Sequence, residues 1–157
     1  MKPLTALLGL IFLATLFFLV PWAFVQLNSA LGWPRWDLGA LIYAGWALIL
    51  AGAAISLQGS RLFQRLGGGT PVPIQPPRRL VTDGLFGYSR NPLFVADVVI
   101  VTGIFLIRGE AALLLYPVLI ALLLQVFVLY VEEPTLAKRY GDEWTRYTEH
   151  VPRWIGR

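Results

Sequence analysis

Cysteine is absent from the 157-residue sequence, and histidine occurs once, as His150. Without cysteine the chain has no disulfide, no thiolate metal ligand and no cysteine nucleophile. A single histidine argues against a histidine-based metal site and against a serine–histidine relay. We therefore expect neither a bound metal nor nucleophilic catalysis of these kinds.

Charge is also scarce. Asp, Glu, Lys and Arg make up 14% of the residues, whereas soluble domains carry roughly 25%. Apolar residues make up 57%, which argues against both a free-standing soluble domain and a disordered chain. The length suits one domain, which we place over residues 1–157. The net charge is +4, but in so apolar a chain the placement of the charged residues matters more than their sum. We therefore expect a lipid bilayer as the partner and no nucleic acid.

Four apolar stretches predict an all-α membrane protein with four transmembrane helices, over residues 4–25, 38–57, 92–107 and 111–131. About 20 helical residues cross a hydrocarbon core of ~30 Å. A signal peptide is the alternative for the first stretch, but its apolar core is usually about 7–15 residues long, so we favour a retained span. The third stretch is short and contains Asp97. Only Arg108, Gly109 and Glu110 separate the last two stretches, which predicts an antiparallel helical hairpin.

The basic residues are distributed unequally about these spans. Arg35 and Arg108 lie on one side, whereas the N-terminus, the 58–91 loop and the C-terminal tail hold the other 11 of the 13 Lys and Arg. Lys and Arg are enriched in cytoplasmic loops. The distribution predicts an inner or cytoplasmic membrane protein with both termini and the 58–91 loop in the cytoplasm.

The C-terminal tail carries an apolar stripe at helical spacing, formed by Leu136, Tyr140, Trp144, Tyr147 and Val151. The stripe predicts an amphipathic cytoplasmic helix over 134–149 that lies along the membrane face or packs on the bundle. Pro134 disfavours helical geometry at the residue before it. We therefore expect a break between the last span and this helix.

Four ionisable residues should lie close to the cytoplasmic ends of the last two spans. Arg90 directly precedes the third span, Asp97 lies inside it, and Glu132 and Glu133 end the fourth. Ionisable groups at membrane depth are costly and usually face the bundle interior or a wet cavity with a partner. The structural alternative makes Arg90 a headgroup anchor or a partner of Asp97, and makes Glu132 a solvated end residue.

Two motifs flank the predicted hairpin. The first is RLVTDGLFGYSRNPLF over residues 79–94, and the second comprises EEPTL over 132–136, YGDEW over 140–144, Tyr147 and VPRW over 151–154. Both motifs, in this order, resemble the signature of the isoprenylcysteine carboxyl methyltransferase and phospholipid methyltransferase group of integral membrane enzymes. The resemblance extends over roughly residues 67–154, which is more than half of the chain.

The resemblance implies methyl transfer from S-adenosylmethionine at the cytoplasmic face, without a metal. It implies cofactor contacts for the loop before the third span, the start of that span and the glutamate pair: Leu80, Val81, Phe86, Tyr88, Asn91, Pro92, Leu93, Phe94, Glu132 and Glu133. Arg90, Glu132 and Glu133 are the candidate catalytic residues, which would position substrate and cofactor. Methyl transfer depends on alignment of donor and acceptor, carboxylates and aromatic faces suit a sulfonium cation, and arginine can hold a carboxylate.

The sequence departs from the family pattern at Asn91, where His is common in the carboxyl methyltransferases, and at Phe94, where Tyr is common. Residues 119–131 also lack the basic residue of relatives that methylate prenylcysteine, and Gln125 is the only strongly polar side chain there. The predicted reaction is methylation of a small amphiphilic or lipid-like acceptor, as in isoprenylcysteine carboxyl O-methylation. Phospholipid amine N-methylation and thiol S-methylation are the alternatives. A non-catalytic membrane scaffold or lipid-binding protein that retains the fold is the alternative of another class.

Overall fold

The computed structural model describes residues 3–67 and 79–156, which form helices, turns and loops with no strand beyond one isolated bridge. The chain divides into two compact units. Unit 1 comprises Met1–Ala53 and Asp97–Ala121, and unit 2 comprises Ala54–Ala96 and Leu122–Arg157. Each unit is therefore built from two segments that are distant in the sequence.

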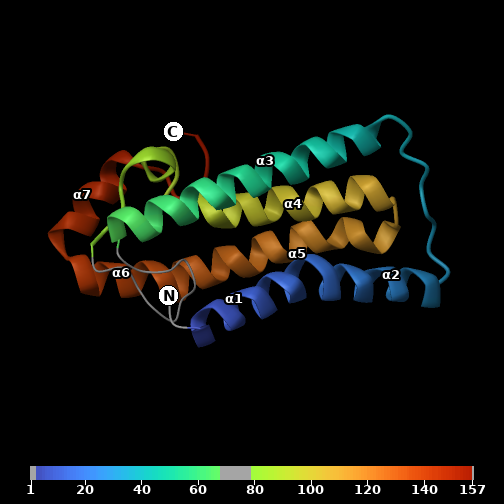
Figure 1. Cartoon of the computed structure of the whole chain (residues 1–157), viewed down its shortest axis with the longest axis horizontal. Coiled ribbons are helices and arrows are strands. Elements are labelled where there is room, and N and C mark those ends of the chain that lie inside the picture. The colour runs from blue at the N-terminus through green and yellow to red at the C-terminus, as the bar shows by residue number, and fades with distance from the viewer. Residues whose placement is uncertain (1–2, 68–78, 157) are drawn as a thin grey trace. The chain divides into compact units, whose positions relative to one another are not determined.

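Seven α-helices make up most of the described chain (Figure 1): α1 (Pro3–Ala14), α2 (Val20–Ala30), α3 (Leu41–Leu62), α4 (Pro92–Arg108), α5 (Ala111–Phe127), α6 (Glu133–Tyr140) and α7 (Asp142–His150). Three π-helical turns join or extend them, at Thr15–Leu19, Phe63–Gly67 and Val128–Glu132, and a 3-10 turn spans Gly84–Gly87. The predicted all-α class is confirmed for the described residues.

Three helical stretches are long and apolar enough to cross a membrane: Leu7–Ala30, Leu41–Gly67 and Ala111–Tyr140. They overlap the first, second and fourth predicted spans, and they identify an integral membrane protein. α4 covers the third predicted span but has only 17 residues. The fourth crossing therefore stays a prediction.

The 58–91 segment, predicted as a loop, starts as a helix. α3 continues to Leu62, and its π turn continues to Gly67. Apolar contacts explain the extension, since the Phe63 ring packs 5.7 Å from the Phe86 ring. Residues 68–78 of the predicted loop lie outside the described residues.

The tail breaks at a different residue from the one expected. Glu133 keeps helical angles (φ −59°, ψ −44°), and its N–H donates to the Val128 carbonyl, five residues back. Such a π turn accommodates a proline inside a continuing helix, because it rearranges the carbonyls that the ring would meet. The break lies at Gly141 (φ 52°, ψ −123°), which divides the segment predicted as one helix over 134–149 into α6 and α7. Positive φ favours glycine at this position.

A short clip joins the α2–α3 connection to the α4–α5 turn within unit 1. The Trp36 N–H donates to the Gly109 carbonyl at 2.8 Å, and the Ala111 N–H donates to the Pro34 carbonyl at 3.1 Å. Gly109 has φ +72°, and a β-carbon there would collide with the Trp36 carbonyl oxygen. Only glycine fits this position.

Asn28 connects α2 by a side-chain hydrogen bond to the start of α5, which lies beside it in Figure 1. The residue is only 4% exposed. Its Oδ1 accepts the Ala112 N–H at 3.0 Å, and its Nδ2 donates to the Trp33 carbonyl at 2.9 Å. The Ala112 N–H belongs to the first turn of α5, where no intrahelical carbonyl is available. Asn28 is therefore a helix cap supplied from a neighbouring helix.

Asn28→Ala should destabilise the folded protein. The substitution leaves the Ala112 N–H and the Trp33 carbonyl without these partners, and each buried unsatisfied group costs about 1–3 kcal/mol. Thermal unfolding in detergent, followed by tryptophan fluorescence, measures the loss. Ser29→Ala is the matched control, because the exposed Ser29 hydroxyl donates to the Val25 carbonyl of its own helix. Equal unfolding temperatures for the two variants would contradict the role of Asn28.

Candidate functional site

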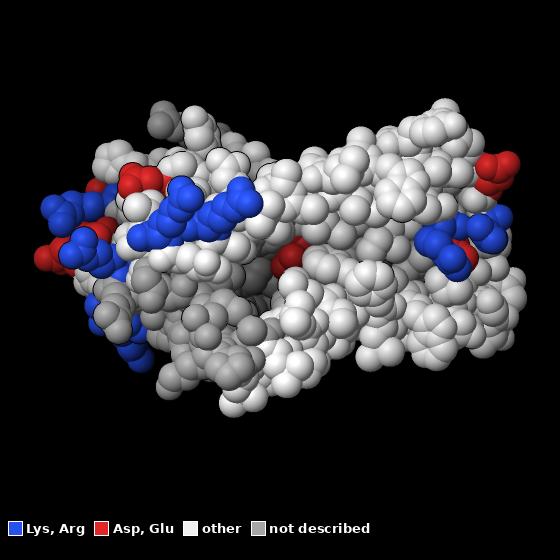
Figure 2. Space-filling model, in the orientation of Figure 1, with Lys and Arg blue, Asp and Glu red and all other residues white. Residues whose placement is uncertain are grey.

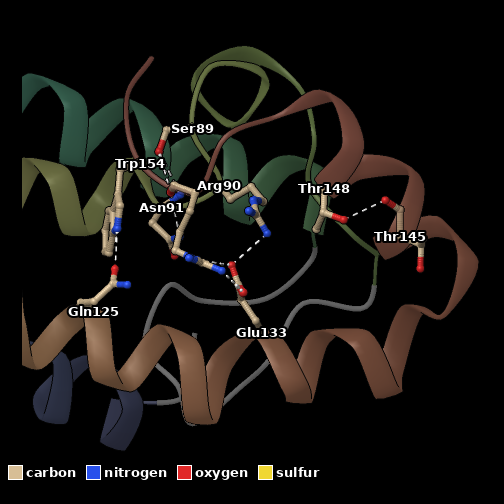
Figure 3. Close-up of polar contacts among 9 residues, drawn as sticks. Ser89, Arg90, Asn91, Gln125, Glu133, Thr145, Thr148 and Trp154 are labelled. Atoms are coloured by element: carbon tan, nitrogen blue, oxygen red, sulfur yellow. Dashed lines mark hydrogen bonds and ion pairs between the residues drawn. The ribbon is translucent and has the colours of Figure 1, made fainter. Parts of the chain in front are cut away.

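Glu133, the first residue of α6, accepts hydrogen bonds from two arginines of unit 2. Arg90 Nη1 donates to Oε1 at 2.8 Å, while Arg153 Nε and Nη2 donate to Oε1 and Oε2 at 2.8 Å each. Figure 3 shows Arg90 and Glu133 pointing toward one another. The side chains of Arg90 and Glu133 are only 12% and 16% exposed, so these charge-assisted bonds are largely shielded from water. One carboxylate thus joins the loop before α4, the start of α6 and the C-terminal segment.

Hydrogen bonds to the main chain reinforce this junction. The Arg90 N–H donates to the Pro152 carbonyl at 2.9 Å. Asn91 Nδ2 and the Ser89 hydroxyl donate to the Arg153 carbonyl at 3.0 and 3.4 Å. Ser89 Oγ in turn accepts the Asn91 N–H at 3.1 Å. Ser89 and Asn91 are only 5% and 6% exposed, so the hydrogen bonds from the 89–91 loop to the C-terminal segment start from buried groups.

An apolar cluster supports the same junction. Trp144, Tyr147 and Val151 form its buried part, and Leu80, Leu136 and Tyr140 pack against it. The stripe predicted from helical spacing therefore packs together inside unit 2. The Tyr147 hydroxyl donates to the Phe86 carbonyl at 2.6 Å, and burial raises the pKa of Tyr147. The Arg90 guanidinium lies 5.7 Å from the centroid of the Trp144 ring, within cation–π distance.

Both arginines remain charged in this setting. Burial lowers the pKa of Arg90, and the Glu133 carboxylate acts in the opposite direction. Hydrogen bonding to Glu133 raises the pKa of Arg153. An arginine stays protonated in proteins, so two positive charges surround the single negative charge of Glu133.

Glu132 and Arg90 each bury one polar atom that lacks a partner. Among residues 3–67 and 79–156, neither Glu132 Oε2 nor Arg90 Nε has a hydrogen-bond partner. A buried polar group left unpaired costs about 1–3 kcal/mol, and more when charged. The two adjacent glutamates therefore differ: arginines occupy both oxygens of Glu133, whereas Glu132 keeps a buried oxygen available.

A recess of about 420 Å³ lies beside Arg90. The last turn of α7 and the residues after it line the rest of its wall: Thr148, Glu149, His150, Val151 and Pro152. A volume of this size falls within the range of small-molecule sites, about 300–1,000 Å³. The recess gives a ligand of moderate size access to one side of Arg90.

The other predicted cofactor residues divide between core and surface. Val81 and Phe86 are 4% and 5% exposed, whereas Tyr88 is 78% exposed. Leu80 packs against the Trp144 cluster, and Phe94 lies edge-on to Phe127 at 6.1 Å. Asn91 is buried just before α4, where Pro92 is the first residue, also buried, and Leu93 follows half-buried. All of them belong to unit 2.

Two further residues of the junction had no predicted role. Arg153 stands in the VPRW motif, and its two hydrogen bonds to Glu133 explain why a basic residue is useful there. Gln125, the one strongly polar residue in the apolar stretch 119–131, accepts the Trp154 Nε1–H at 2.7 Å. A lone polar side chain in an apolar helix was the available signal, but its partner lies 29 residues away.

Asp97, half-buried in unit 1, has no hydrogen bond or ion pair of its side chain to any described residue.

Arg153→Gln should loosen the C-terminal segment. The substitution removes the guanidinium that bonds both oxygens of Glu133, and breaking a fully buried pair costs about 3–5 kcal/mol. The loss should be smaller here, because the Arg153 side chain is 30% exposed. Hydrogen–deuterium exchange should speed up at residues 151–154 and 89–91. Arg146→Gln, at an exposed position of α7, is the control, and equal exchange in both variants would argue against the junction.

Comparison with known proteins identifies a family. The model of the phospholipid methyltransferase family matches residues 40–143, well over half of the chain. Neither the curated proteins nor the solved structures contain a significant match. The matched range runs from the residue before α3 into α7, and it includes Arg90, Glu132 and Glu133. The chain therefore belongs to the phospholipid methyltransferase family, and it is a membrane methyltransferase by family.

Proposed function

We propose that this protein transfers a methyl group from S-adenosylmethionine to a small amphiphilic or lipid-like acceptor at the cytoplasmic face of the membrane. Family membership supports methyl transfer, and such families generally use S-adenosylmethionine. The observation that carries the site assignment is the pair of buried, unpartnered atoms, Glu132 Oε2 and Arg90 Nε. One belongs to a carboxyl group and the other to a guanidinium, which donates hydrogen bonds.

The chemistry of these two groups fits the proposed cofactor. S-adenosylmethionine supplies an activated methyl group on a sulfonium cation, and it also carries an ammonium and a carboxylate. A shielded carboxylate attracts a cation, and an arginine N–H donates to a carboxylate oxygen. We assign the cation contact to Glu132 and the carboxylate contact to Arg90. The recess beside Arg90 supports this assignment because it leaves room for a ligand there.

Glu133 has a different proposed role. Because two arginines occupy its carboxylate, Glu133 acts by holding Arg90 in place and by closing the C-terminal segment over the loop. The remaining proposed cofactor contacts come from the 80–94 segment: Leu80, Val81, Phe86, Tyr88, Asn91, Pro92, Leu93 and Phe94. Precise alignment of donor and acceptor supplies much of the acceleration of a displacement reaction, so a rigid frame for Arg90 serves catalysis directly.

The proposed topology has four crossings in a single domain over 1–157, with the termini and the 58–91 segment in the cytoplasm. α4 supplies the crossing in addition to the three long apolar helices. Its 17 residues extend about 26 Å at 1.5 Å per residue, slightly less than the ~30 Å hydrocarbon core. The positive-inside distribution of Lys and Arg supports this orientation. Acceptors of a lipid-like kind would reach the site from the bilayer.

A phospholipid amine is the favoured acceptor among the three classes. The description of the matching family names phospholipids, and the apolar stretch 119–131 lacks a basic residue that would pair with a prenylcysteine carboxylate. Transfer of a radiolabelled methyl group to phosphatidylethanolamine, to an N-acetylated prenylcysteine and to an alkyl thiol, in parallel reactions, separates N-, O- and S-methylation. Labelling of the prenylcysteine or the thiol alone would overturn the amine assignment.

The purified protein in detergent should bind S-adenosylmethionine with a micromolar Kd, about −8 kcal/mol, as measured by titration calorimetry. Glu132→Gln should weaken binding by about 10-fold to 100-fold, because a hydrogen bond to a charged group contributes about 1.5–3 kcal/mol. Its unfolding temperature should stay unchanged, since no described group bonds the lost oxygen. Glu143→Gln, an exposed position on α7, is the matched control.

Glu133→Gln provides the contrast to Glu132→Gln. This variant should lower the unfolding temperature, because it removes the charge that two arginines share. Unaltered binding by Glu132→Gln would remove Glu132 from the site. Absence of S-adenosylmethionine binding by the wild-type protein would overturn the proposed function in favour of a non-catalytic scaffold.

A further inference from the structure

Unit 1 contains a polar recess of about 260 Å³ where the α2–α3 connection meets the end of α4. Arg35, Trp36, Asp37 and Arg108 supply its polar and aromatic wall, and aliphatic side chains from the α2–α3 connection, the start of α3 and the end of α4 supply the rest. None of these residues takes part in the proposed methyl transfer. The proposed methyl transfer therefore does not account for this recess.

The recess lies at the level where a membrane surface is expected. Leu41 and Ala111, the first residues of two helical stretches long and apolar enough to cross a membrane, both follow it closely in the chain. Trp36 in its wall and Trp33, three residues earlier, are each 41% exposed. Tryptophan is enriched at the boundary between hydrocarbon and water. In Figure 2 blue and red atoms gather at this end of unit 1. Phospholipid headgroups are the most abundant polar groups at this depth.

One buried carboxylate at this end neutralises only part of the positive charge. Glu110, 5% exposed, accepts Arg108 Nε at 3.3 Å and Nη2 at 3.0 Å. Arg35 Nε donates to the Arg108 carbonyl at 3.0 Å and lies 3.8 Å from Glu110 Oε1. The terminal nitrogens of Arg35 bond no described residue, and its side chain is 67% exposed. These N–H groups remain available to a phosphate.

Asp37 adds a negative charge to the same wall. Its Oδ1 accepts the Gly39 N–H at 3.0 Å, and its other oxygen bonds no described residue. Counting Arg35, Asp37, Arg108 and Glu110, the charges cancel, so the recess does not select a plain anion. It offers guanidinium donors and a carboxylate acceptor together. A ligand with a phosphate and a neighbouring ammonium matches both.

We propose that this recess binds the phosphoethanolamine headgroup of a bilayer phospholipid. Arg35 and Arg108 hold the phosphate, and Asp37 accepts hydrogen bonds from the primary ammonium. Phosphatidylcholine binds less well because its quaternary ammonium has no N–H to donate. Phosphatidylglycerol binds less well because it brings no cation to Asp37. The bound lipid bridges the α2–α3 connection and the end of α4.

Native mass spectrometry of the full chain in detergent tests the proposal. Phosphatidylethanolamine, phosphatidylcholine and phosphatidylglycerol with identical acyl chains are titrated separately, and phosphatidylethanolamine should bind most tightly. Arg35→Gln should weaken its binding about fivefold, the effect of about one basic residue near a phospholipid surface. Arg65→Gln, an exposed arginine near the opposite end of the candidate span Leu41–Gly67, is the matched control and should leave binding unchanged. Asp37→Asn should remove the preference for phosphatidylethanolamine over phosphatidylcholine.

Several outcomes would overturn the headgroup assignment. Tighter binding of phosphatidylglycerol than of phosphatidylethanolamine would mean that the recess attracts anionic lipid only. Equal losses in the Arg35 and Arg65 variants would mean general attraction to basic residues. A retained preference in Asp37→Asn, with an unchanged unfolding temperature, would remove Asp37 from the site. Because Asp37 is exposed, this variant stays informative even if Arg35→Gln destabilises the clip.

Discussion

The structure of unit 2 depends on one carboxylate shared by two arginines. Glu133 bonds Arg90, 43 residues earlier, and Arg153, 20 residues later, so a single side chain connects three segments that the chain order separates. Its two oxygens are occupied, and its shielding from water strengthens the bonds. This bonding distinguishes Glu133 from the adjacent Glu132. Glu132 is the same residue type and directly precedes Glu133, but its buried Oε2 has no partner among the described residues.

Unit 1 contains a similar group, in which one shielded acid pairs with two arginines. There Glu110 is the buried acid, and Arg35 and Arg108 are the more exposed arginines. In each unit the acid is well shielded, and some guanidinium N–H groups beside it bond no residue of the ranges 3–67 and 79–156. Two small groups thus pair opposite charges in a chain with only 14% charged residues. Each group combines a structural bond with unused hydrogen-bonding capacity, which is the combination that a polar ligand at a membrane surface requires.

The apolar runs predicted the helices well because burial in lipid and helical hydrogen bonding act on the same continuous stretch of chain. The position of Gly141 and the π turn before Pro134 could not be predicted in the same way. Local propensity places the break at the proline, but the structure keeps the helix there through the bond from the Glu133 N–H to the Val128 carbonyl. A π turn of this kind leaves no clear mark in the sequence.

The sequence predicted which residues form the site better than it predicted what each of them does. The motifs brought Arg90, Asn91 and both glutamates together, and the structure places them in one unit. The division of labour between Glu132 and Glu133 depends on which of them Arg90 and Arg153 reach, and that choice is made by long-range packing. Likewise, Asn28 is polar in an apolar helix, and only its contact with the start of α5 explains it.

The most direct test is an experimental structure with S-adenosylmethionine, or with a non-reactive analogue that keeps its positive charge. We expect polar atoms of the ligand within hydrogen-bond distance of Glu132 Oε2 and Arg90 Nε, while Glu133 keeps its bonds to Arg90 and Arg153. A ligand that contacts Glu133 after displacing the arginines, or that binds away from unit 2, would contradict the assignment of the two glutamates.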